Sequence, residues 1–188
     1  MIDKHLLPIY IEIHEQSLNL QKASDFVNHP EAGAVNLFVG TTRNHHDGKR
    51  VIELYYDCYR EMAIKELRKI AEKMLEKHDL KRIWITHRTG LVPIGEASII
   101  LAVSSAHRKN AFDATAEAME LIKKEVPIWK KEQFEGETVW KEEKLIENDG
   151  ESKREKWKVS AVPSLNRSGK RLFAYNFDGY LRHIAFQE

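Results

Sequence analysis

Apolar residues recur at helical spacing in three stretches of the chain. They repeat every three or four residues over 20–27, from 61 to about 74, and over 108–125, which places one apolar stripe along each predicted helix. In the second stretch the stripe consists of Ala63, Leu67, Ile70, Ala71 and Met74. Pro127 ends the third helix, because proline lacks a backbone N–H and pushes its predecessor out of helical geometry.

Shorter runs have the composition of β-strands. Four of them, rich in branched and aromatic residues, cover 9–13, 51–59, 81–87 and 97–105. In the second run the drier face is expected to carry Ile52, Leu54, Tyr56 and Cys58. Residues 33–40 form an apolar run between glycines, which predicts a buried strand, and the polar residues 41–48 predict a loop. Because strands flank the helices without a strict strand-helix-strand repeat, we predict an α+β fold with a mostly antiparallel sheet.

The chain changes character near residue 145. Its 188 residues, 42% of them hydrophobic, suffice for one ordinary domain, which we assign to 1–144. Residues 141–158 are dominated by charge, which is typical of a solvated linker or a frayed helix. Residues 171–180 regain alternating aromatics and predict a strand that docks on the body or on a partner. Residues 145–188 therefore form a C-terminal extension whose role the pattern does not give.

Composition excludes several classes of protein. The 30 Lys and Arg balance 29 Asp and Glu, whereas a protein that wraps nucleic acid normally carries a basic excess. Cys58 is the only cysteine, so an internal disulfide framework and a multi-cysteine zinc site are excluded. The first residues lack the apolar core of a secretory signal, and the apolar stretch 97–106 is about half as long as a membrane-spanning helix. We expect a cytoplasmic protein with no nucleic-acid or membrane partner.

Cofactor motifs are missing from the sequence. Nine histidines suggest metal binding, but neither His-Glu-x-x-His nor Cys-x-x-Cys occurs. Neither a P-loop nor Gly-x-Gly-x-x-Gly is present. We therefore expect no metal and no organic cofactor.

Lys123 has an unusual place on the third helix. The stripe on which it falls consists of Phe112, Ala116 and Met119. Lys124 points about 100° away, toward solvent with Glu117 and Glu120. Burial would lower the pKa of Lys123 and supply a neutral amine for attack on an acyl carbon or for proton transfer. The alternative, which the wheel alone favours, is a cation of the last turn that complements the helix dipole and extends to water.

A second lysine cluster follows the proline. Lys130 lies in the string Trp129-Lys130-Lys131-Glu132, close to the helix end. Two lysines converging on one pocket would attract an anionic substrate and would lower one lysine pKa by mutual repulsion. A solvated charge run is the alternative, and it is the more frequent case for such a string.

Two strand ends are candidate anion sites. At 104–109 a strand meets a helix N-terminus, where backbone N–H groups, His107 and Arg108 could bind a phosphate. The equally weighted alternative is ordinary capping by Ser105 with both neighbours merely exposed. Arg43, in the loop after the strand at 33–40, could form a second anion clamp, although a plain surface loop is more frequent.

Four segments together resemble one known family. They are 38–45, 87–90, 104–108 and 123–132, the last reading Lys-Lys-Glu-Val-Pro-Ile-Trp-Lys-Lys-Glu. In order and spacing they resemble the large, catalytic subunits of molybdopterin synthase, and the resemblance covers about residues 9–143. It implies an α/β hammerhead fold with a mostly antiparallel sheet and a sulfurtransferase activity.

The resemblance also implies partners and a substrate. It implies a homodimer flanked by two copies of a small ubiquitin-like subunit, together a heterotetramer. The C-terminal Gly-Gly of that subunit carries a thiocarboxylate. Two rounds of sulfur transfer convert cyclic pyranopterin monophosphate into the dithiolene of molybdopterin, a step of molybdenum cofactor biosynthesis. Because sulfur arrives on the partner, the lack of a suitable cysteine in this chain is expected.

The resemblance assigns roles to individual residues. Lys123 and Lys130 match the two catalytic lysines: we interpret Lys123 as nucleophile or proton carrier and Lys130 as the group that polarises or protonates the substrate. Residues that match pterin and phosphate ligands are Arg43, His107 and Arg108, the last two contributed across the dimer. Residues that match neighbouring pocket positions are Thr41, Thr42, Lys131 and Glu132.

Two readings without turnover stay open. A binding module would keep the pterin or anion pocket and lose catalysis. A scaffold would keep the dimer and the partner surface while residues 145–188 recruit another molecule. The presence of both lysines and of the His107-Arg108 pair argues against either form of degeneration.

Overall fold

The structure, a computed structural model, describes residues 7–46, 48–134, 137–141, 164–165, 171–177 and 180–185. The chain divides into two compact units, residues 1–145 and 146–188. In the part of the chain that the structure describes, no helix is both long and apolar enough to cross a membrane.

A four-stranded sheet forms the centre of the first unit. Its strand order is β1 (Ile9–His14), β5 (Leu80–Arg88), β7 (Ala97–Ser105) and β2 (Ala34–Thr41). Strands β1 and β5 are parallel, and the other pairs are antiparallel. The prediction of an α+β fold with a mostly antiparallel sheet is therefore confirmed.

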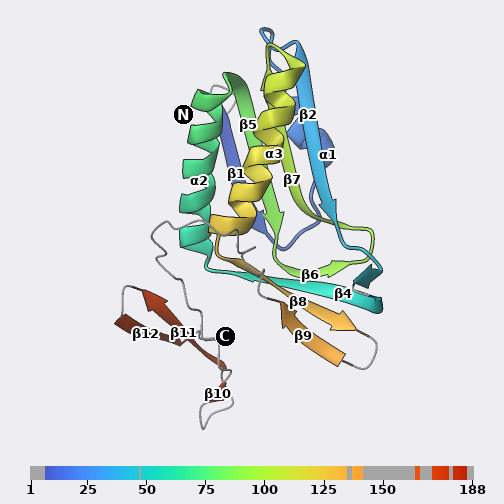
Figure 1. Ribbon diagram of the computed structural model, residues 1–188, viewed down its shortest axis with the longest axis vertical. Coiled ribbons are helices and arrows are strands. Elements are labelled where there is room, and N and C mark those ends of the chain that lie inside the picture. Colours follow the sequence, from blue (N-terminus) through green and yellow to red (C-terminus); the bar gives the residue numbers. More distant parts are fainter. Residues whose placement is uncertain are drawn as a thin grey trace, which may run out of the picture. The chain divides into compact units, whose positions relative to one another are not determined.

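Helices cover both faces of this sheet (Figure 1). Helices α2 (Arg60–Lys77) and α3 (Arg108–Glu125) pack on one face, and α1 (Leu20–Val27) packs on the other. The buried residues of α2 are the five of the predicted stripe. Because β5 and β7 are covered on both sides, neighbours such as Ile83 and Trp84 are both buried. Each fully buried Ile or Leu contributes about 1.5–3 kcal/mol through the hydrophobic effect.

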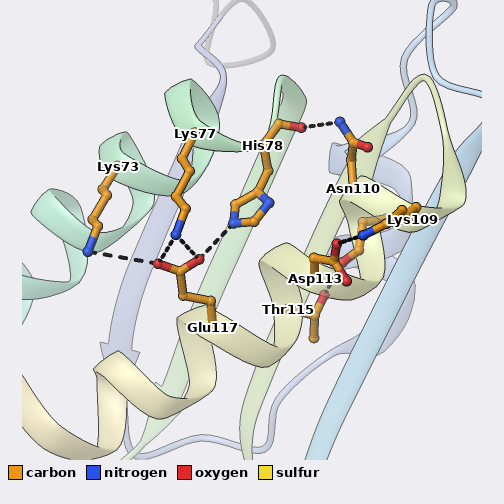
Figure 2. A network of polar contacts seen from close by, with 9 residues as sticks. Lys73, Lys77, His78, Lys109, Asn110, Asp113, Thr115 and Glu117 are labelled. Atoms are coloured by element: carbon orange, nitrogen blue, oxygen red, sulfur yellow. Dashed lines mark hydrogen bonds and ion pairs between the residues drawn. The ribbon is translucent and has the colours of Figure 1, made fainter.

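A polar network joins α2 to α3 (Figure 2). Glu117 of α3 accepts hydrogen bonds from Lys77 Nζ at 2.7 and 2.8 Å and lies 2.9 Å from His78 Nε2. These hydrogen bonds lower the pKa of the Glu117 carboxyl. Asn110 Nδ2 donates to the His78 carbonyl at 2.9 Å. The expectation that Glu117 faces solvent is met only in part, because its side chain is 26% exposed and also faces α2, where it helps to fix the middle of α3.

A second sheet lies at one end of the first. Its order is β3 (His45–His46), β4 (Lys49–Cys58), β8 (Ile128–Phe134) and β9 (Glu137–Lys141), and β6 (Gly90–Pro93) also pairs with β4. A small apolar cluster of Val51, Leu54 and Phe134, with Tyr56 packed against it, lies on one face. This sheet carries the residues that follow α3.

Three expectations about strands are wrong. Strand β2 is an edge strand rather than a buried one, and Val35, Leu37 and Val39 are exposed. Ile52 is 44% exposed, because an irregularity in the β4–β8 register between Val51 and Glu53 breaks the alternation. The expected loop at 41–48 contains the short strand β3.

The second unit contains a small antiparallel sheet. Its strands are β10 (Ser164–Leu165), β11 (Arg171–Phe177) and β12 (Tyr180–Ala185), in that order. A strand was predicted within 171–180 and is found at β11. The expected linker lies almost wholly outside the described residues, and the role of 145–188 stays a prediction.

Candidate functional site

A tight chain reversal joins α3 to β8 and carries the two predicted lysines. The Val126 N–H donates to Ile122 O at 3.1 Å and ends the helix, and Ile128 N–H donates to Val126 O at 2.8 Å. Pro127 O accepts from the backbone N–H of Tyr59 at 3.2 Å, which holds the reversal against the start of α2. Lys123 in the last turn of α3 and Lys130 on β8 therefore lie at the same end of the unit (Figure 1).

Lys123 is exposed, so the expectation that it points to the dry side is wrong. The buried stripe of α3 is Ala111, Ala114, Thr115, Ala118 and Ile122. It runs one residue earlier than the stripe read from the sequence, and one residue is about 100° on a helix. The small alanines let the helix approach the sheet closely, whereas Phe112 is 57% exposed. Lys123 instead occupies the last turn, where a cation complements the helix dipole.

Lys130 has a partly buried ion pair. Its Nζ lies 3.6 Å from Oε1 of Glu132, and the two side chains are 27% and 3% exposed. They share a face of β8 because side chains two residues apart in a strand point the same way. Lys131 lies on the opposite face, paired across the sheet with Tyr55. The structure therefore brings Lys130 and Glu132 together and separates Lys131 from them.

A neutral histidine lies close to the strand position of Lys130. Lys130 pairs with Tyr56 across β4 and β8, and the Tyr56 ring meets the His87 ring edge-on at 5.1 Å. Burial lowers the pKa of His87 to about 4. Its Nδ1 lies 2.8 Å from the carbonyl oxygen of Arg88, so this nitrogen carries the proton and donates it. The imidazole therefore adds no charge here at neutral pH.

Arg43 lies in the loop after β2, next to a buried residue that holds the start of the loop in place. Thr41 is exposed. Thr42 is 2% exposed, and its hydroxyl donates to Val92 O at 3.4 Å, so this side chain supports the loop rather than facing solvent. Arg43 is exposed, with Nη2 3.2 Å from Nδ1 of His46. Of the three, Arg43 offers the cationic group that an anion requires.

His107 and Arg108 lie at the other end of the unit. His107 is the residue before α3, and Ser105 Oγ donates to its carbonyl at 2.8 Å instead of capping the helix. Arg108 and Lys123 lie near opposite ends of α3, separated by about 23 Å along the helix at 1.5 Å per residue. The register of β2 with β7 likewise places Thr41 beside Ala97 and Ala34 beside Ser105. One chain therefore does not bring His107 and Arg108 to the two lysines.

Cys58 is not a suitable nucleophile. It is half-buried, and burial raises the pKa of its thiol to about 11. The thiol therefore stays protonated at neutral pH, whereas the thiolate is the reactive form.

Four residues near the site had no predicted role. His87 and Arg88 lie in one of the four motif segments, Tyr56 is expected only on the drier face of a strand, and Glu96 lies in no segment that the sequence singles out. Tyr56 and His87 lie on strands that are distant in the sequence, whereas Arg88 and Glu96 lie at the two ends of the short segment that contains β6. The motif at 87–90 was the only signal that could have indicated them.

Comparisons with known proteins agree in one identification. Residues 13–125 match the family model described as MoaE protein. The molybdopterin synthase catalytic subunit of Homo sapiens is 47% identical over 131 residues, which is 70% of each chain. The crystal structure of molybdopterin synthase from Staphylococcus aureus matches with a TM-score of 0.67 at 36% identity, over 70% of this chain and 96% of that one. A complex of subunits 1 and 2 of the molybdopterin-converting factor from Helicobacter pylori has a TM-score of 0.60 at 23% identity, over 71% and 91%, which shows the fold alone.

Proposed function

The chain belongs to the MoaE protein family, whose relatives include molybdopterin synthase catalytic subunits, and from that premise we propose that it is the sulfurtransferase subunit of this synthase. It transfers two sulfur atoms from the thiocarboxylated C-terminus of a small ubiquitin-like subunit to cyclic pyranopterin monophosphate. The product is the dithiolene of molybdopterin. The observation that carries the proposal is the placement of Lys123 and Lys130 at one end of the unit by the α3–β8 reversal.

Lys123 is the lysine that meets the partner. Its exposure at the end of α3 makes the amine accessible to an incoming chain terminus. A thiocarboxylate is anionic, so a lysine ammonium attracts it. We assign Lys123 one of two roles at the partner's terminal carbonyl: a proton carrier as the ammonium, or a nucleophile once the ammonium has given up its proton. In the Helicobacter pylori neighbour the same fold forms a complex with a second subunit.

Lys130 is the lysine that meets the substrate. Its ammonium lies beside the buried carboxylate of Glu132. A buried carboxylate needs a nearby cation, so this pair restricts where the Lys130 side chain lies. Lys130 is thereby held in place to polarise or protonate the pterin.

The anion-binding residues come from two copies of the chain. Arg43 lies at the lysine end, whereas Arg108 lies about 23 Å from Lys123 along α3, with His107 just before it. A homodimer in which the partner copy supplies His107 and Arg108 completes the site. Support for such a dimer comes from the edge strand β2 and from the exposed side chains of Leu37 and Val39, which share one face of that strand, since exposed apolar patches mark interaction surfaces. With the small subunit bound to each copy, the assembly is a heterotetramer.

Two neighbouring lysines provide the test. Purified protein is mixed with thiocarboxylated partner and cyclic pyranopterin monophosphate, and the product is detected as a fluorescent oxidised pterin. Lys123→Ala should abolish product and retain partner binding. Lys124→Ala, which removes another exposed lysine of the same turn, should retain both. Full activity of Lys123→Ala would refute the assignment, and partner binding by wild type without any product would favour a scaffold.

A further inference from the structure

An ion pair joins the two ends of the segment that contains β6. Arg88, the last residue of β5, donates from Nη1 to Oε2 of Glu96, which directly precedes β7. The Arg88 side chain is only 13% exposed. Its Nε is buried and has no hydrogen bond within the described residues. Since a buried guanidinium needs a counter-charge, Glu96 is an important partner for Arg88.

The backbone around Glu96 holds the base of the Arg43 loop. Thr42 N–H donates to Glu96 O at 3.1 Å, and Gly95 N–H donates to Thr42 O at 2.8 Å. Glu96 N–H donates to Pro93 O at 3.1 Å and closes a four-residue turn. Gly95 has φ +82° in this turn, a conformation that glycine adopts without strain. Thr42 is thus bonded through both its N–H and its carbonyl to a turn that the ion pair anchors.

The connection to Arg43 is direct along the chain. Thr42 is the residue before Arg43, and it is buried. A fixed base restricts where the exposed guanidinium of Arg43 can lie. Restricting a binding group before the ligand arrives improves affinity, because less conformational entropy is lost on binding.

We propose that Arg88 and Glu96 are positioning residues for the Arg43 anion clamp and thereby set the affinity for the phosphate of the pterin substrate. The inference rests on the proposed function, which assigns Arg43 to that phosphate. Neither residue touches the substrate. The turn at 93–96 transmits their effect through Thr42.

A double-mutant cycle tests whether the effect passes through Arg43. The dissociation constant of cyclic pyranopterin monophosphate is measured by calorimetry for wild type, Glu96→Gln, Arg43→Ala and the double variant. Glu96→Gln should weaken binding about tenfold in wild type and less than about twofold in the Arg43→Ala background. The inference would be overturned if the increases in dissociation constant caused by the two single substitutions multiply in the double variant. It would also be overturned if Glu96→Gln leaves the affinity unchanged.

Two further variants separate positioning from folding. Arg88→Glu combined with Glu96→Arg reverses the pair and should restore affinity relative to either single variant, with thermal unfolding followed in parallel. Glu66→Gln removes a carboxylate from a different ion pair, with Lys69 at 2.7 Å on α2, and should leave affinity unchanged. An equal loss of affinity in Glu66→Gln would refute a specific role for Glu96.

Kinetics distinguish this inference from the proposed function. With thiocarboxylated partner present, Glu96→Gln should raise KM about tenfold with kcat within about twofold of wild type, since ground-state binding is lost. A wild type that binds the pterin without turnover would contradict the proposed function, while the calorimetric cycle would still decide the positioning role. A wild type that does not bind the pterin would overturn both.

Discussion

A mixed dimer tests whether the site is shared between two copies of the chain. One copy carries Lys123→Ala and the other carries Arg108→Ala, with different affinity tags so that hybrid dimers are purified from co-expressed chains. If the partner copy supplies Arg108, one site of the hybrid combines both substitutions and the other combines both native residues. If each site used residues of one chain, every site would lack one of the two.

The geometry predicts the size of the effect. About 23 Å of helix separates Arg108 from Lys123 in one chain, far more than an arginine side chain can reach. Each dimer with Lys123→Ala on one copy and Arg108→Ala on the other should therefore hold one intact site of two and show about half of the wild-type activity. The homodimeric Lys123→Ala variant should show only background activity.

The assay is product formation with saturating thiocarboxylated partner and with pterin below its wild-type KM, so that loss of a phosphate ligand lowers the measured rate. A control hybrid carries both substitutions on one copy and none on the other. In that control each site lacks one residue in the shared arrangement, so it should stay near background. Half activity in the control hybrid and background activity in the test hybrid would refute the shared site.

Other predictions concern single residues. Lys130→Ala should lower the rate constant of a single turnover at least about a hundredfold, the usual scale of acid-base catalysis. An unchanged rate constant would contradict its role. Arg43→Ala should chiefly raise KM for the pterin, and an unchanged KM in steady-state assays would contradict the clamp. His87 has a pKa of about 4 against about 6.5 when unfolded, so the unfolded chain binds the extra proton between these values. The contribution of His87 to the free energy of unfolding is therefore complete above about pH 6.5 and falls by about 3 kcal/mol as the pH is lowered toward 4. Denaturant unfolding should show that His87→Gln lacks this decrease. Leu67→Ala should lower the free energy of unfolding by about 2–5 kcal/mol, because Leu67 is fully buried; urea titration measures it, and a loss under about 1 kcal/mol would contradict the packing described.

The helices and central strands could be predicted because local pattern determines them. The α2 stripe is periodic over five residues, and Pro127 marks where α3 must end. The burial of β2 could not be predicted, because apolar composition does not distinguish a central strand from an edge strand. The exposure of Ile52 depends on a register irregularity with β8, a segment more than 70 residues later.

The site was predictable in its residue types more than in its geometry. Motif spacing indicated Lys123, Lys130 and Arg43, but the helical wheel placed Lys123 on the wrong face, since Phe112 outweighed the small alanines that pack on the sheet. The motif at 87–90 contains Arg88, but no local pattern indicated its pairing with Glu96. The cytoplasmic location and the role of residues 145–188 stay predictions.

The source of the sulfur tests the central claim most directly. The partner is prepared with its C-terminal thiocarboxylate labelled with ³⁴S and is incubated with this chain and cyclic pyranopterin monophosphate, and the dithiolene product is analysed by mass spectrometry. The account predicts a product that carries two ³⁴S atoms and forms only when Lys123 is present. Unlabelled dithiolene, or labelled product formed equally by Lys123→Ala, would contradict it.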